Sequence, residues 1–352
     1  YTGTTSSAAS DVYKRQGQTW TQLKCGIPTV AVRDIAIQKR ETDLVLATFG
    51  RGFYILDDYS GLRHISEETL DKEAFIFPIK DSWMFHPSKP LGLRGNTFQG
   101  SAYYAASNPP IAAVFTYYLK EEIKTLKSNR KDKEKEIEES GGTIEYPPFE
   151  KIRMEDDEIK PHLIFTVSDS KGNVITKLKT EAEKGINRIS WDFRYPASTP
   201  LELEKPSFDN PFSDPDRGPL ALPGTYTVSL SKVVNGKLTE IVPATEFKTK
   251  LLANTTLPAE DKDALFKFQE EVAEFQRVVS GTAKTLDELN SKLKYFYKAV
   301  NNTSGIPDDV SSRIVKTDQQ LKILNRKLNG DRSLSSRDFE TPPSITGRIY
   351  TI

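Results

Sequence analysis

The sequence is poor in the residues that build covalent cross-links and metal centres. It holds one cysteine, Cys25, and three histidines. A single cysteine excludes an intrachain disulfide framework and a cysteine-rich metal site. His64, His86 and His162 stand apart, without a second ligand at metal-binding spacing, so each is expected to be structural or at the surface. We therefore expect no metal and no other cofactor.

The sequence also lacks an excess of charge and a long apolar run. Lys plus Arg and Asp plus Glu both number 49, so the basic excess that supplies most nucleic-acid affinity is missing. No stretch approaches the roughly 18 apolar residues that a membrane span needs. Gly-x-Ser-x-Gly, His-Glu-x-x-His and Walker sequences are absent as well. We expect a globular chain with no nucleic-acid partner, no membrane span and no recognisable catalytic motif.

Residues 1–16 show neither strand alternation nor a helical stripe. They begin with a run rich in Thr, Ser and Ala, and they continue with Asp-Val-Tyr-Lys-Arg-Gln. That second run resembles the artefactual ends of protein fragments that are translated from metagenomic sequencing reads. We expect this leader to be non-native or disordered and to contribute nothing to the fold.

A β pattern begins at residue 17. Short apolar runs joined by polar or glycine turns predict strands at 34–38, 44–49 and 53–56. A later series of alternating runs predicts further strands at 113–119, 163–167, 174–178, 186–193, 224–230 and 238–247. The turns at 170–173 and 234–237 contain Asn and Gly, which tolerate positive φ. The later series predicts an immunoglobulin- or fibronectin-like sandwich, whose core side chains include Trp191, Phe193, Tyr226 and Val228.

Two segments interrupt the sandwich pattern. Residues 120–160 are dense in Lys and Glu and predict a solvated helix or a disordered excursion. Residues 200–219 are rich in Pro and Asp and predict an extended surface loop. Neither segment is expected to contribute to the core.

The pattern becomes helical after residue 258. Apolar residues recur at helical spacing from Leu265 to Val279 and again from Leu286 to Val300. A third stripe includes Leu321, Leu324 and Leu328, in a segment opened by Pro307 and closed by Gly330. With Gly281 and Gly305 as breaks, the sequence predicts three amphipathic helices.

Several stretches resemble one family of proteins. Residues 17–20, Gly-Gln-Thr-Trp, resemble the second half of an Asp-box, although Tyr13 and Arg15 stand where its Ser and Asp belong. Residues 43–58 resemble the last blade of the bacterial BNR-repeat, sortilin-like β-propeller proteins called "glycosyl hydrolases". Further resemblances follow in the family's order, at 74–78, 108–112, 185–194 and 223–228.

The resemblance implies a mainly β chain with an α-helical C-terminal part. The resemblance covers about residues 17–250. Together with the patterns above, it divides the chain into a leader (1–16), a terminal β-propeller blade (17–60), a connector (61–110), a β-sandwich with a charged insertion at 120–160 (111–252), and a helical bundle with a tail (253–352). It also implies the C-terminal part of a longer protein that is secreted, periplasmic or on the cell surface. The upstream propeller blades would then be the partner.

Arg51, Asp57 and Asp58 are the candidate binding residues. Arg51 lies between two glycines, where a guanidinium can reach a carboxylate ligand; alternatively, it pairs with Asp57 or Asp58. The aspartates could be read as glycosidase carboxylates, but neighbouring strand residues point to opposite faces and such enzymes need a pair across a cleft. We expect turn residues that end the strand. Trp83, Phe85 and His86 are expected to dock the propeller against the sandwich.

Two functions remain open. In the first, the chain is a non-catalytic scaffold for a propeller that binds a glycan or peptide ligand. In the second, it is part of a sialidase-like glycoside hydrolase whose active site lies mostly in upstream blades. We favour the first, because no catalytic residue is evident in the chain.

Overall fold

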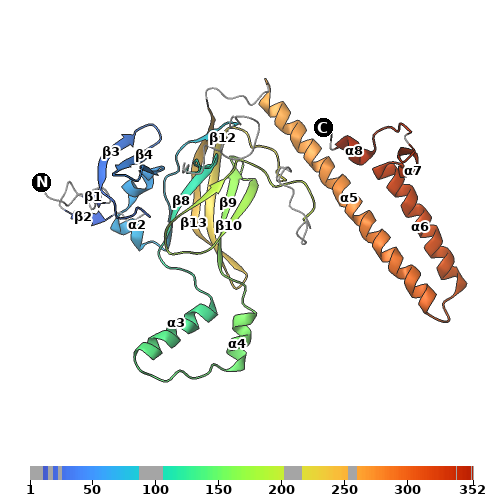
Figure 1. The fold of residues 1–352 in the computed structure, drawn as a ribbon, viewed down its shortest axis with the longest axis horizontal. Coiled ribbons are helices and arrows are strands. Elements are labelled where there is room, and N and C mark those ends of the chain that lie inside the picture. The colour runs from blue at the N-terminus through green and yellow to red at the C-terminus, as the bar shows by residue number, and fades with distance from the viewer. Residues whose placement is uncertain are drawn as a thin grey trace. The chain divides into compact units, whose positions relative to one another are not determined.

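The computed structural model describes residues 26–86, 106–201, 216–252, 260–337, 339–349 and 351, together with short strands at 11–14 and 19–22. The chain divides into two compact units. The strand unit comprises Tyr1–Asp192 and Gly224–Leu252, and the helical unit comprises Phe193–Pro223 and Ala253–Ile352. The core strands form a curled, half-barrel arrangement, and the C-terminal part is helical (Figure 1). The expectation of a β chain that ends in helices is confirmed at this level.

The core of the strand unit is made of two sheets. One has the order β10-β9-β12-β13-β7, and the other has the order β11-β8-β6. The strands of this core are β6 (Ala74–Ile76), β7 (Ser82–Met84), β8 (Ala113–Leu119), β9 (His162–Asp169), β10 (Val174–Thr180), β11 (Gly185–Trp191), β12 (Gly224–Val234) and β13 (Lys237–Leu251). All neighbours pair antiparallel except β13 and β7, which run parallel.

Aromatic rings fill the space between the two sheets. Every second residue of β8 is buried, as expected for a strand with one face on a core. The Phe115 ring of β8 lies 6.4 Å from that of Phe165 and 5.1 Å from that of Phe247. The rings of Trp191 and Tyr226 are 5.2 Å apart. The core side chains expected from the sequence are all buried, namely Trp191, Phe193, Tyr226 and Val228.

The segment expected to be a connector contributes to both core sheets. After a 3₁₀ helix, η1 (Tyr59–His64), and α2 (Glu67–Asp71), strand β6 pairs with β8 and strand β7 pairs with β13. Each of these strands has three residues, too few for alternation to be visible in the sequence. The connector expectation is therefore wrong for residues 74–84, and residues 87–105 lie outside the described part.

A separate three-stranded antiparallel sheet precedes the core. It comprises β3 (Val32–Gln38), β4 (Asp43–Thr48) and β5 (Phe53–Leu56), in that order. The sequence predicts these three strands, at 34–38, 44–49 and 53–56. Before this sheet, β1 (Asp11–Lys14) pairs with β2 (Thr19–Gln22), and Tyr13 lies opposite Trp20. The leader was expected to hold no strand, and for residues 11–14 that expectation is wrong because β2 supplies a partner.

The charged excursion holds two helices, α3 (Leu126–Glu139) and α4 (Phe149–Asp156), and neither contains a buried residue. The Arg130 guanidinium on α3 binds both carboxylate oxygens of Glu155 on α4, at 2.6 and 2.9 Å. Glu158 accepts a hydrogen bond from the backbone N–H of Leu126 at 2.7 Å. The sequence-based expectation of a solvated excursion is confirmed, in its helical form.

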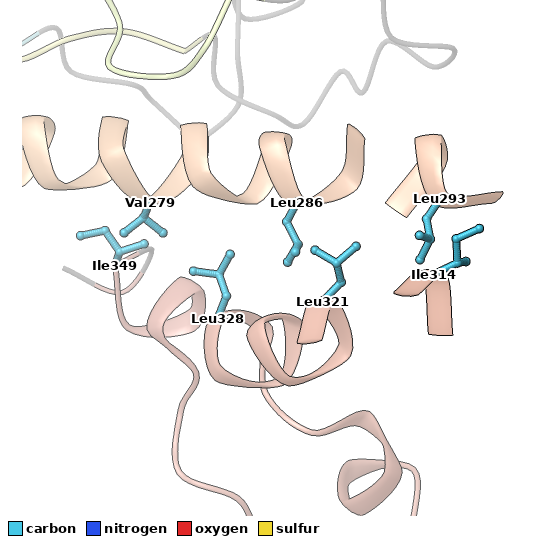
Figure 2. Close-up of a cluster of buried hydrophobic side chains, with 7 residues drawn as sticks. All are labelled: Val279, Leu286, Leu293, Ile314, Leu321, Leu328 and Ile349. Carbon is cyan, nitrogen blue, oxygen red and sulfur yellow. The ribbon is translucent and has the colours of Figure 1, made fainter. Parts of the chain in front are cut away.

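The helical unit is built on α5 (Lys262–Asn302) and α6 (Asp308–Asn329), with the short helices α7 (Arg332–Ser335) and α8 (Ile345–Ile349) after them. Figure 2 shows the buried cluster: Val279 lies near Ile349 and Leu328, Leu286 near Leu321, and Leu293 near Ile314. The buried residues recur every seven positions on both helices, which is the spacing of an antiparallel helix pair that packs along one seam.

One long helix stands where the sequence predicts two. Both apolar stripes belong to α5, which runs through Gly281 without a break. A mid-helix glycine costs only about 1 kcal/mol relative to alanine, which continuous packing against α6 outweighs. The expected break at Gly305 is confirmed, as are the helix start after Pro307 and its end at Gly330.

The loop after the sandwich strand at 186–193 belongs to the helical unit, not to the sandwich as expected. The Tyr195 ring lies 5.3 Å from that of Phe266, and the Ser198 hydroxyl lies 3.0 Å from the Gln276 amide oxygen. Further along, Lys284 donates a hydrogen bond to the carbonyl of Leu201 at 2.9 Å. Most of the expected surface loop, residues 202–215, lies outside the described part.

Candidate functional site

A groove of about 670 Å³ lies in the strand unit, between the β3–β5 sheet and the core. We call it the junction groove. The β3–β4 turn and the end of β5 supply one wall, and β7 with parts of β8 and β11 supplies the other. Its charged and aromatic lining residues are Glu41, Asp43, Asp57, Asp58, Lys80, Asp81, Trp83, Phe85 and Arg188.

Glu41 and Lys80 form an ion pair in the wall. The Lys80 ammonium lies 2.8 Å from the Glu41 carboxylate and donates to the Glu41 carbonyl at 3.0 Å. The hydrogen bond from Lys80 lowers the pKa of Glu41, and the charges of Lys80 and Arg40 and a hydrogen bond from Trp83 act in the same direction, against the effect of burial. Glu41 is therefore held as a carboxylate that already has partners.

Asp58 holds the strand end in place. Its backbone is left-handed, with φ at 44°, and its carboxylate accepts hydrogen bonds from the Thr42 hydroxyl at 2.9 Å and the Ser60 N–H at 3.1 Å. Its own N–H donates to the Asp43 carboxylate at 2.9 Å. Asp58 and Asp43 thus build the junction between the strand end and helix η1, which matches the expected turn role.

Asp57 differs from its neighbours. It is half-buried in the groove wall, and among the described residues no hydrogen-bond or ion-pair partner of its carboxylate is found. By contrast, Asp81 is ion-paired with Lys250. The Arg188 guanidinium donates to the Asp58 carbonyl at 2.7 Å, which ties β11 to the end of β5. Asp57 is therefore the carboxylate of the groove lining that can accept a hydrogen bond from a ligand.

The structure brings together only part of the predicted site. Asp57 and Asp58 line the junction groove, whereas Arg51 lies in the β4–β5 turn at the other end of β5. Strand residues rise about 3.3 Å each, so Arg51 lies about 20 Å along the chain from Asp57. No ion pair of Arg51 with Asp57 or Asp58 exists among the described residues, and that alternative is wrong.

The groove's cations, Lys80 and Arg188, could not be recognised from the sequence. Lys80 meets Glu41 across 39 positions, and Arg188 meets Asp58 across 130 positions. Residues so far apart in the sequence form no short motif from which their contact could be predicted. Trp83 and Phe85 were expected to dock two parts of the chain, and both line the groove between the β3–β5 sheet and the core.

The arrangement supports hydrogen bonding and ring stacking. Within the described ranges, no group of three or more His, Cys, Asp or Glu side chains could hold a metal ion, and Cys25 lies outside those ranges. None of the helices described there is long and apolar enough to cross a bilayer. The groove is thus a largely apolar recess with an aromatic wall, one carboxylate that is unpaired among the described residues, and two cations already engaged in internal contacts.

Comparison with known proteins yields no match, either to a protein-family model or to a curated protein. Function is therefore inferred from the geometry of the groove.

Proposed function

We propose that the chain is a non-catalytic binding and scaffold part of an exported propeller protein, and that the junction groove binds a glycan or an extended peptide. One observation carries this proposal. Four of the five acidic side chains in the groove are engaged in contacts within the fold, namely Glu41, Asp43, Asp58 and Asp81. Acidic side chains that are paired within the fold hold the walls of the groove in place. They are not available as catalytic acids, bases or nucleophiles.

The remaining groups suit a hydroxyl-rich or amide-rich ligand. Trp83 and Phe85 supply apolar ring surface, which binds ligands with one apolar face. Asp57 accepts hydrogen bonds from ligand hydroxyl or amide groups. A few placed polar groups on an otherwise apolar wall are the usual composition of a ligand-binding site.

The β3–β5 sheet supports the proposed propeller blade. Large apolar side chains are exposed on both of its faces: Phe53 (74% exposed) and Ile55 (59%) on one, Ile35 (47%) and Ile37 (53%) on the other. A sheet that is apolar on both faces requires cover on both, as blades give one another. We propose upstream blades of the same protein as that cover, and an immunoglobulin-like sandwich for the two core sheets.

The alternative, part of a glycoside hydrolase, has one observation in its favour, the open carboxylate of Asp57. A glycosidase needs two carboxyl groups across the scissile bond, and one of them must have a raised pKa to act as an acid. Glu41 shows the opposite shift, towards a lower pKa. We therefore rank the binding function first.

The test is isothermal calorimetry of the full chain against a panel of neutral, amino and acidic oligosaccharides and extended peptides. Trp83→Ala should weaken binding of any ligand found by about tenfold, the upper range for an aromatic contact. Tyr146→Ala, on the exposed excursion, is the matched control and should bind like the parent chain. Absence of binding across the panel would sink the proposal, and turnover of aryl glycosides lost in Asp57→Asn would establish the alternative.

A further inference from the structure

A second groove, of about 580 Å³, runs along the helical unit beside the seam of Figure 2. We call it the helical groove. Its apolar floor includes Leu286, Leu321 and Leu328, whose other sides form the buried cluster. Its rim includes Val278 (54% exposed), Leu289 (43%) and Leu324 (52%). Two helices bury only one stripe of each other, and the apolar face of α5 is wider than the stripe that α6 covers.

Gly281 lies in this groove, in the middle of α5. A β-carbon built at Gly281 would meet no atom within 4 Å, so no packing within the described chain requires a glycine there. Its neighbours in the groove, Thr282 and Thr285, are also small. Because glycine costs about 1 kcal/mol relative to alanine in a helix, its presence is explained if another backbone lies against it.

The charge of the groove has one sign. Arg277 and Lys327 line it, and no acidic residue does. Lys327 has no carboxylate partner among the described residues, and Arg277 pairs with Glu274 at 2.6 Å in an exposed contact. Exposed pairs of this kind contribute at most about 1 kcal/mol, so an incoming carboxylate can replace Glu274.

We propose that the helical groove receives one amphipathic helix of a partner protein, with acidic residues flanking its apolar stripe. The stripe packs on Val278, Leu289 and Leu324, the small residues around Gly281 admit the partner backbone, and the acidic flanks meet Arg277 and Lys327. This is the helix-in-groove mode of recognition. A second copy of the chain fits less well, because a two-fold contact would place the same basic rim against itself.

The experiment measures fluorescence anisotropy of a labelled amphipathic peptide of about 20 residues, long enough to form a helix, with leucines at i, i+3, i+4 and i+7 and glutamates on both flanks. The control peptide carries lysine in place of every glutamate. The full chain should bind the acidic peptide at least about tenfold more tightly. Lys327→Glu should reverse or abolish that preference.

Two substitutions of apolar residues by aspartate distinguish binding in the groove from nonspecific hydrophobic binding. Leu324→Asp should weaken binding by about tenfold or more, whereas Ile323→Asp should leave it within about twofold. Ile323 is the matched control, because it is 49% exposed, adjacent in sequence and outside the groove lining. Gly281→Leu should block binding, and circular dichroism should show the helices intact.

Several outcomes overturn the proposal. The acidic peptide could fail to bind, both peptides could bind equally, or the two aspartate substitutions could have equal effects. The chain could also sediment as a dimer that Leu324→Asp converts to a monomer. A gain in peptide affinity when residues 202–215 are replaced by a Gly/Ser linker would equally overturn it, since the chain itself would then compete for the groove.

Discussion

Asp57 and Asp58 are adjacent in the sequence and have opposite roles. Asp58 adopts a left-handed backbone and accepts hydrogen bonds from Thr42 and Ser60, whereas Asp57 has no such partner among the described residues. Asp58→Ala should therefore lower the free energy of unfolding by about 1 to 2 kcal/mol, the usual cost of a lost cap. Asp58→Asn should cost less, because asparagine tolerates this backbone and keeps an acceptor. Asp57→Ala is the control, and a loss as large as that of Asp58→Ala would refute these assignments. Urea unfolding measures all three.

The Glu41–Lys80 pair makes stability depend on pH. Lys80 lowers the pKa of Glu41 in the folded chain below its unfolded value of about 4.3. The pair therefore stabilises the fold above that pH, and the stabilisation is lost as the pH falls through the lowered folded value. Glu41→Gln should reduce the free energy of unfolding at neutral pH by up to about 1 kcal/mol.

The difference between the parent chain and Glu41→Gln should shrink as denaturation is repeated from about pH 6 towards pH 3. Glu136→Gln, on the exposed helix α3, removes an acid that has no ion-pair partner among the described residues, so it should match the parent throughout. A constant difference at every pH would argue against the pair.

Residue roles were predictable from the sequence only where the chemistry was local. Two aspartates directly after an apolar run indicate a turn, and the structure has one at Asp58. The contacts of Lys80 with Glu41 and of Arg188 with Asp58 depend on how three separate elements pack. Nothing in the neighbouring residues encodes such packing, so the groove itself could not be predicted.

At the scale of elements, α5 shows which glycines end a helix. Gly281 continues the helix with open space at its β-carbon, whereas Gly305 has φ at +80° in the turn before α6. Gly281→Ala should raise the stability of the helical unit by about 1 kcal/mol. Gly305→Ala should lower it, because alanine is strained at positive φ. Thermal melting followed by circular dichroism compares the two, and destabilisation by Gly281→Ala would mean that α5 is interrupted there.

The continuity of α5 was visible in the sequence in one respect. Val279, Leu286 and Leu293 keep a spacing of seven across Gly281, and an interrupted helix has no reason to keep that phase. The edge strands β6 and β7 gave no comparable signal, because three residues cannot establish a period. A long helix can therefore be predicted from the regular spacing of its apolar residues. A short edge strand cannot, because it forms only where the fold supplies a neighbouring strand.

At the scale of the whole molecule, the two units offer separate optical signals. All three tryptophans, Trp20, Trp83 and Trp191, belong to the strand unit. Ellipticity at 222 nm is dominated by α5 and α6 of the helical unit. Since the helical unit has a thin core with one buried seam, we expect its signal to melt first and the tryptophan fluorescence later. Coincident curves would instead mean one cooperative unit.

The parallel pairing of β7 with β13 has a consequence for how the protein is made. Ser82 leaves the ribosome early, but its partner Thr249 is translated only after the whole excursion and every other core strand. The five-stranded sheet cannot be completed until β13 has been synthesised, and until then β7 lacks its partner strand. Folding of the strand unit therefore ends with a late closing step, and conditions that stall translation between β12 and β13 should leave an intermediate for chaperones to protect.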